Sequence, residues 1–133
     1  MKSYTDIEQS KKLAEILPIE SADQTWEIIA IAGANLDVPE EMEYWHNCNT
    51  PHILSSKVGI PCWSLAALLN TLPVSIDEGQ HCLALINSNP NGDIEWLCCY
   101  EDDNGNLLME CYADNQVDAC VEMILDLHEQ KLI

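Results

Sequence analysis

Three features of the sequence predict an α+β fold in a single domain. Two Asn-Gly steps separate three alternating segments between residues 81 and 112. Because Asn and Gly tolerate positive φ, this pattern predicts a three-stranded antiparallel meander. Apolar residues at helical spacing predict helices near 5–17, 63–72 and 115–130 that pack against the sheet. The length of 133 residues fits one domain, 1–133, and 47% apolar residues are enough to build a core.

The first helix, near 5–17, begins with Thr5-Asp6-Ile7-Glu8, which has the spacing of a capping box between Thr5 and Glu8. Pro18 ends this helix. Residues 25–32 favour an extra strand, although a short apolar run also fits a helix. Residues 33–60 follow no clear period. This long connection is either a functional loop or contains structure that the pattern does not reveal.

The helix near 63–72 carries four leucines at helical spacing and ends at Pro73. The last helix, near 115–130, has one apolar side, which is expected to dock on the sheet. Its start can be capped by Asp114 or Asn115. A second stripe of this helix, with residues four apart, is acidic and is expected to face water. It consists of Asp114, Asp118, Glu122 and Asp126.

The charge of the chain excludes several classes of partner. There are 23 acidic residues against 5 lysines and no arginine, which gives a net charge of −18. Nucleic acids and anionic lipid surfaces would repel such a chain, so we expect no direct nucleic acid and no membrane as partners. Solubility is the simplest role for the charge.

The cysteines and the N-terminal residues predict a cytoplasmic protein. Seven cysteines, an odd number, argue against a secreted disulfide framework and for small buried apolar side chains. The first residues lack the apolar run of a signal peptide, and no segment approaches the length of a membrane span. No cofactor is expected.

The segment 44–63 contains the residue types of a metal or thiol site. His46, Cys48 and His52, with Cys62 as a fourth ligand, are weak zinc candidates, because the segment has no paired C-x2-C or H-x3-H unit. The alternative is that these residues share no role. A cysteine nucleophile would need a recognisable active-site context, and the sequence offers none.

The sequence also resembles a group of small uncharacterised proteins of gut anaerobic bacteria that are associated with prophages and other mobile elements. The matching blocks extend over most of the chain outside residues 24–59. They are Ile7–Glu15, Ser21–Asp23, Ile60–Leu65, Leu72-Pro73, Val117–Ile124 and Leu127–Glu129. The resemblance implies a compact domain and a mobile-element context, but it implies no activity.

These features together favour a non-enzymatic accessory protein that acts through protein–protein interaction. Acidic residues one helical turn apart rise by about 6 Å, close to the phosphate spacing of a nucleic-acid strand. The chain could therefore be a DNA mimic that inhibits a basic host protein, although a solvated helix face is commonly charged without any partner. The candidate interaction residues are the acidic stripe with Tyr44 and Trp45. A homo-oligomer is compatible with the sequence, and the alternative function is a small metal-binding or thiol-dependent enzyme using residues 44–63.

Overall fold

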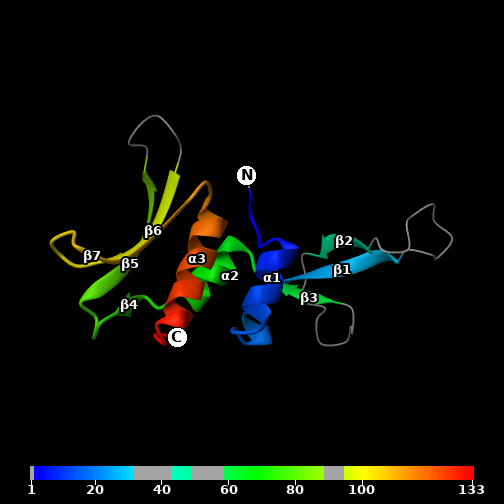
Figure 1. Cartoon of the computed structure of the whole chain (residues 1–133), viewed down its shortest axis with the longest axis horizontal. Coiled ribbons are helices and arrows are strands. Elements are labelled where there is room, and N and C mark those ends of the chain that lie inside the picture. The colour runs from blue at the N-terminus through cyan, green and yellow to red at the C-terminus, as the bar shows by residue number, and fades with distance from the viewer. Residues whose placement is uncertain (1, 32–42, 49–58, 89–94) are drawn as a thin grey trace. The chain divides into compact units, whose positions relative to one another are not determined.

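The computed structural model describes residues 2–31, 43–48, 59–88 and 95–133 (Figure 1). Helices and two antiparallel sheets confirm the α+β fold. The chain divides into two compact units. One consists of Asp6–Trp63, and the other consists of Met1–Thr5 with Ser64–Ile133. The single domain expected from the length stays a prediction. Within the described residues, no helix is both long and apolar enough to cross a membrane.

The unit Asp6–Trp63 is built on a three-stranded sheet in the order β2-β1-β3, with both pairs antiparallel. Its elements are α1 (Ile7–Ala14), the 3-10 helix η1 (Ile19–Ser21), β1 (Gln24–Ile31), β2 (Glu43–Cys48) and β3 (Ile60–Cys62). The predicted strand at 25–32 is thus β1, the centre of its own sheet. Strand β2 lies in the segment 33–60, for which the sequence showed no period, and β3 begins at its last residue, Ile60.

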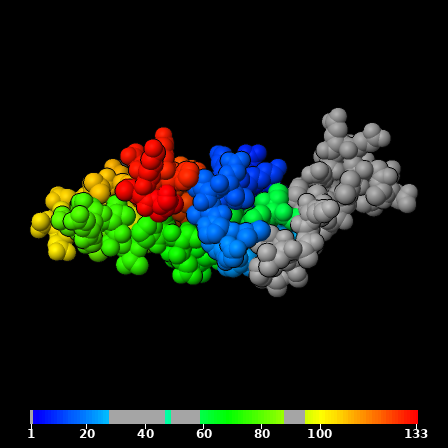
Figure 2. Space-filling model, turned by 90° about the horizontal axis from the view of Figure 1, so that it is seen from below, coloured from blue at the N-terminus to red at the C-terminus, as the bar shows by residue number. Residues whose placement is uncertain are grey.

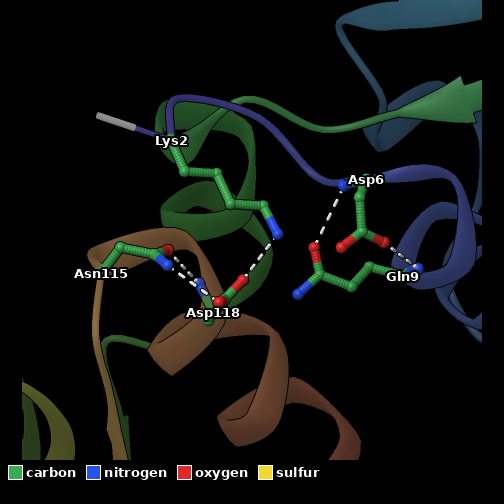
Figure 3. Close-up of polar contacts among 5 residues, drawn as sticks. All are labelled: Lys2, Asp6, Gln9, Asn115 and Asp118. Carbon is green, nitrogen blue, oxygen red and sulfur yellow. Dashed lines mark hydrogen bonds and ion pairs between the residues drawn. The ribbon is translucent and has the colours of Figure 1, made fainter.

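The N-terminus of α1 is capped one residue later than the sequence suggested. The side chain of Asp6 accepts a hydrogen bond from the amide of Gln9 at 2.8 Å, and the Gln9 side chain accepts one from the amide of Asp6 at 3.1 Å (Figure 3). The predicted capping box of Thr5 and Glu8 is therefore wrong by one residue, since Asp6 and Gln9 form the box. Both Thr5 and Asp6 are good capping residues, and Thr5 is instead fully buried.

Trp63 ties the end of β3 to η1 inside this unit. Its side chain is fully buried, and its indole Nε1 donates to Ser21 Oγ at 2.9 Å. Ser21 Oγ in turn donates to the carbonyl of Pro18 at 2.6 Å. The buried indole thus has its hydrogen-bond partner, which burial of a polar group requires.

The other unit contains the predicted meander, extended by one short strand into a four-stranded antiparallel sheet of order β4-β5-β6-β7. Its elements are α2 (Leu65–Thr71), β4 (Ser75–Ile76), β5 (His81–Ser88), β6 (Glu95–Glu101), β7 (Leu107–Ala113) and α3 (Gln116–Glu129). The helix predicted near 63–72 begins only at Leu65, since Ser64 is its N-cap and accepts a hydrogen bond from the amide of Ala67.

The apolar side of α3 lies against β6 and β7, and α2 contacts α3 (Figure 1). The α3 residues at helical spacing that the sequence assigned to the core are almost fully buried. They are Val117, Cys120, Val121, Ile124 and Leu127. From the sheet, Tyr100 is fully buried, and its hydroxyl donates to the carbonyl of Pro73 at 2.8 Å.

The turn between β6 and β7 differs from the two-residue Asn-Gly turn that the sequence suggested. Gly105 has φ 81, but Asn104 is not among the residues with positive φ. The turn is instead organised by Asp102, whose carboxylate accepts hydrogen bonds from the amides of Asn104 and Asn106. The Asn106 side chain also donates to Asp102 Oδ2, and this bond, followed by those from the backbone amides, holds the pKa of Asp102 below its usual range. The other predicted turn, at Asn91-Gly92, lies outside the described residues.

The C-terminus of α3 ends in a Schellman motif. The amide of Lys131 donates to the carbonyl of His128 at 3.0 Å, and the amide of Leu132 donates to the carbonyl of Leu127 at 2.8 Å. Lys131 occupies the left-handed position with φ 61, where glycine is the usual residue. A residue with a Cβ atom is strained in this conformation.

We therefore expect Lys131→Gly to raise the free energy of unfolding by about 1 kcal/mol, because glycine removes the left-handed strain. Urea unfolding followed by circular dichroism measures the change. The control is Gln130→Gly, where the backbone is right-handed with φ −79 and glycine should destabilise the protein. A Lys131→Gly variant no more stable than the parent would contradict this account of the helix end.

Candidate functional site

Two of the four carboxylates of the predicted acidic stripe make hydrogen bonds within the unit that contains Ser64–Ile133. Asp118 lies in the first turn of α3 and is about one-third exposed. It accepts hydrogen bonds from Lys2 Nζ and from Asn115 Nδ2, each at 2.8 Å (Figure 3). The Asn115 side chain also caps the helix by accepting from the amide of Asp118. Asp118 thus fixes the start of α3 and the segment that contains Lys2.

The remaining three acids of the stripe differ in environment. Asp126 is half-buried, and its Oδ2 accepts a hydrogen bond from Cys111 Sγ at 3.2 Å. Asp114 and Glu122 are exposed. Asp114 precedes the helix, since Asn115 is the N-cap residue. Asp118, Glu122 and Asp126 lie on α3 as the spacing predicted, but the expected exposure to water holds only for Asp114 and Glu122. The spacing could not show that Asp118 and Asp126 make structural contacts.

The candidates of the segment 44–63 fall largely on strand β2. The backbone of Tyr44, Trp45 and His46 pairs with β1 at Ala30, Ile28 and Glu27, so these residues belong to a strand rather than to an irregular loop. Their side chains lie outside the described part of the chain, as does all of His52. Their role in binding stays a prediction.

Cys48 and Cys62 lie on opposite sides of β1, since β1 is the central strand of their sheet. Cys62 is fully buried, and its sulfur accepts a hydrogen bond from Asn47 Nδ2 at 3.3 Å. Burial, with a hydrogen bond to Glu27, raises the pKa of Cys48. Across the residues that the structure describes, no three His, Cys, Asp or Glu side chains are arranged to hold a metal ion.

The four-stranded sheet presents a second feature, which the sequence reading missed. Because side chains alternate along a strand, the residues next to Cys98 and Cys111 point away from α3. We call the surface that they form the open face. Its members on β5, β6 and β7 are Ala84, Ile86, Leu97, Cys99, Leu108, Glu110 and Tyr112.

An apolar row crosses the open face. Ile86, Leu97 and Tyr112 lie opposite one another in the registers of β5, β6 and β7. Ile86 is 40% exposed, Tyr112 is 49% exposed and Leu108, farther along β7, is 51% exposed. Leu97 is only 8% exposed, because it lies on a central strand between two side chains. Three large apolar side chains on one sheet surface are thus left in contact with water.

Acidic side chains adjoin this row. Glu110 lies directly opposite Cys99 in the register of β6 and β7, and its Oε2 accepts a hydrogen bond from the Tyr112 hydroxyl at 3.4 Å. The negative charge of Glu110, with smaller contributions from burial and Glu95, raises the pKa of Tyr112. The sequence contains no lysine or arginine between residues 58 and 130. The surface is therefore apolar at its centre and negative at its border.

One signal in the sequence could have revealed the open face. Residues 96–100, Trp-Leu-Cys-Cys-Tyr, form an uninterrupted apolar run rather than an alternating one. Such a run is typical of a strand with apolar side chains on both faces. Only one of these faces is covered by α3. On the other face, Leu97 and Cys99 of β6 are themselves buried, and the apolar side chains in contact with water lie on the neighbouring strands β5 and β7.

Three thiols meet between the sheet and α3. Cys98 and Cys111 are directly opposed on β6 and β7, and Cys120 of α3 is hydrogen-bonded to Cys98. All three are buried. The hydrogen bond with Cys120 and burial raise the pKa of Cys98, and burial with the bond to Asp126 raises the pKa of Cys111 from 9.0 to about 12. At neutral pH these two groups are thiols rather than thiolates, so they serve as core residues.

We therefore expect slow reaction of the buried cysteines and fast reaction of Cys82, which is exposed. A disulfide reagent such as dithionitrobenzoate at pH 8 should show a fast phase from Cys82 in the native protein. Cys82→Ser should remove that phase, whereas Cys111→Ser should leave it intact. Fast labelling of Cys98 or Cys111 in folded protein, identified by peptide mapping, would contradict the assignment of these thiols to the core.

Comparisons of the chain with protein families, with curated proteins and with solved structures find no match.

Proposed function

We propose that this protein is a non-enzymatic interaction protein and that the open face of its four-stranded sheet binds a protein partner. The observation that carries the proposal is the exposure of Ile86, Leu108 and Tyr112 on one face of the sheet, where the buried Leu97 lies between Ile86 and Tyr112. Exposed contiguous apolar surface commonly marks a binding site, and tyrosine is frequent among the residues that contribute most to binding energy.

The charge of the surface favours a basic partner. Glu95, Glu101 and Glu110 lie on the strands of the open face, and no lysine or arginine lies on them. A partner that presents apolar side chains flanked by lysine or arginine would match both features. The net charge of −18 would also accelerate the encounter at low ionic strength. Direct binding of nucleic acid is disfavoured by the same charge.

A basic nucleic-acid-binding protein of a bacterial host is the partner class that agrees with this chemistry. The resemblance to proteins of prophages and mobile elements supports an accessory role in that setting. DNA mimicry through α3 is a narrower form of the proposal. Of its four acids, Asp114 and Glu122 are exposed, while Asp118 and Asp126 are held by Lys2 and Cys111. The open face is thus the better supported surface.

The proposal is tested by capture from a lysate of a gut anaerobic bacterium with the tagged chain and surface variants. The double variant Ile86→Ser and Tyr112→Ser should retain the partner about tenfold less, because it removes two exposed anchors of the apolar row. Quantitative mass spectrometry measures the retained protein. The matched control is Ile19→Ser, which alters a side chain that is 36% exposed in the other unit.

Retention of one basic protein by the wild type and the Ile19 variant, with loss from the double variant, is the expected result. Equal retention of the same proteins by all three chains would show that the open face is not the binding surface. Circular dichroism of each variant confirms that the fold is intact.

A further inference from the structure

Strand β7 forms an edge of the four-stranded sheet. It pairs with β6 on one side, and the described residues contain no strand on its other side. An edge strand leaves alternate backbone amides and carbonyls directed outward, where an extended segment of another chain can pair with them. Natural edge strands are commonly protected by lysine or proline. The seven residues of β7 contain neither.

A hollow lies beside this edge. It has a volume of about 290 Å³ and is lined by Leu108 and Met109 of β7 and by Gln130 and Leu132 after α3. In the space-filling view, atoms of the β7 segment (orange) lie next to those of α3 (red) (Figure 2). Leu108 and Met109 are neighbours in a strand, so their side chains point to opposite faces of the sheet. The hollow is thus lined by one β7 residue of each face. It offers room for an apolar side chain of an added strand.

The charge along β7 selects between two kinds of added strand. Glu110 is the central residue of Leu107–Ala113 and is exposed. If β7 paired antiparallel with β7 of a second copy about this centre, the two Glu110 side chains would be opposed, and like charges directly opposite are destabilising. A strand carrying lysine or arginine opposite Glu110 would instead form a favourable cross-strand pair. The charge thus disfavours self-pairing and favours a basic segment.

We propose that β7 binds an extended basic segment of a partner protein by strand addition, with lysine or arginine opposite Glu110 and an apolar side chain in the hollow at Leu108 and Leu132. This inference rests on the proposed function and names its mode of binding. The added strand continues the sheet, so its side chains on one face extend the open face.

The probe is a fluorescein-labelled ten-residue peptide of alternating lysine and valine, compared with a peptide of alternating glutamate and valine. Fluorescence anisotropy at low salt should show binding of the lysine peptide alone. Hydrogen exchange of the complex should slow at residues 107–113. Glu110→Lys should weaken binding about fivefold or more. The matched control is Glu20→Lys, which changes net charge equally at an exposed site of the other unit and should change affinity less than twofold.

Each other outcome overturns the inference. Equal weakening by both substitutions shows general charge attraction, and an unchanged exchange rate at 107–113 shows binding elsewhere. A dimer of the chain alone in sedimentation, with β7 protected, shows that a second copy occupies the edge. The proposed function is tested separately. It is contradicted when the double substitution of Ile86 and Tyr112 leaves partner capture unchanged. The strand addition is contradicted when hydrogen exchange at residues 107–113 is not slowed in the complex.

Discussion

The apolar side of α3 packs on the inner face of β6 and β7, and the rest of this unit is organised around that contact. Ile124 and Leu127 are fully buried in α3, as are Cys98 and Tyr100 in β6. Burying a large apolar side chain contributes about 1.5–3 kcal/mol each, which is enough to fix the position of the helix. Asn115 at one end and the Schellman turn at Lys131 at the other end set its length.

Because one helix layer covers one face of the sheet, the packing determines which surface remains exposed. The inner face takes the thiols and Tyr100, and the opposite face keeps Ile86, Leu108 and Tyr112 in contact with water. The edge at β7 adjoins both this face and the end of α3. A lysine-free stretch from 58 to 130 gives this whole surface one sign of charge. For the proposed function, apolar contact and charge therefore favour the same class of partner, a basic protein.

Local patterns predicted the three helices, β1 and the strands β5, β6 and β7, but not β2, β3 or β4. Long-range contacts determine what the local patterns leave open. The alternation between 81 and 112 and the helical spacing at 115–130 predicted the sheet and α3 because each depends on nearby residues. The capping register shifted from Thr5 to Asp6 because both residue types can cap a helix. The stripe containing Asp118 followed from spacing, but its ion pair with Lys2 joins residues 116 positions apart and no local pattern encodes it. The open face was hidden for the same reason, since pairing of β5, β6 and β7 brings its residues together.

The central claim is that one face of the four-stranded sheet is open to solvent in the free protein. The most direct measurement is the relaxation of side-chain methyl groups by NMR in the presence of a soluble paramagnetic agent. The account predicts strong relaxation of the Ile86 and Leu108 methyl groups and weak relaxation of those of Val117 and Leu127. Equal protection of all four residues would show that the face is covered in the free chain, and the proposed binding surface would then be wrong.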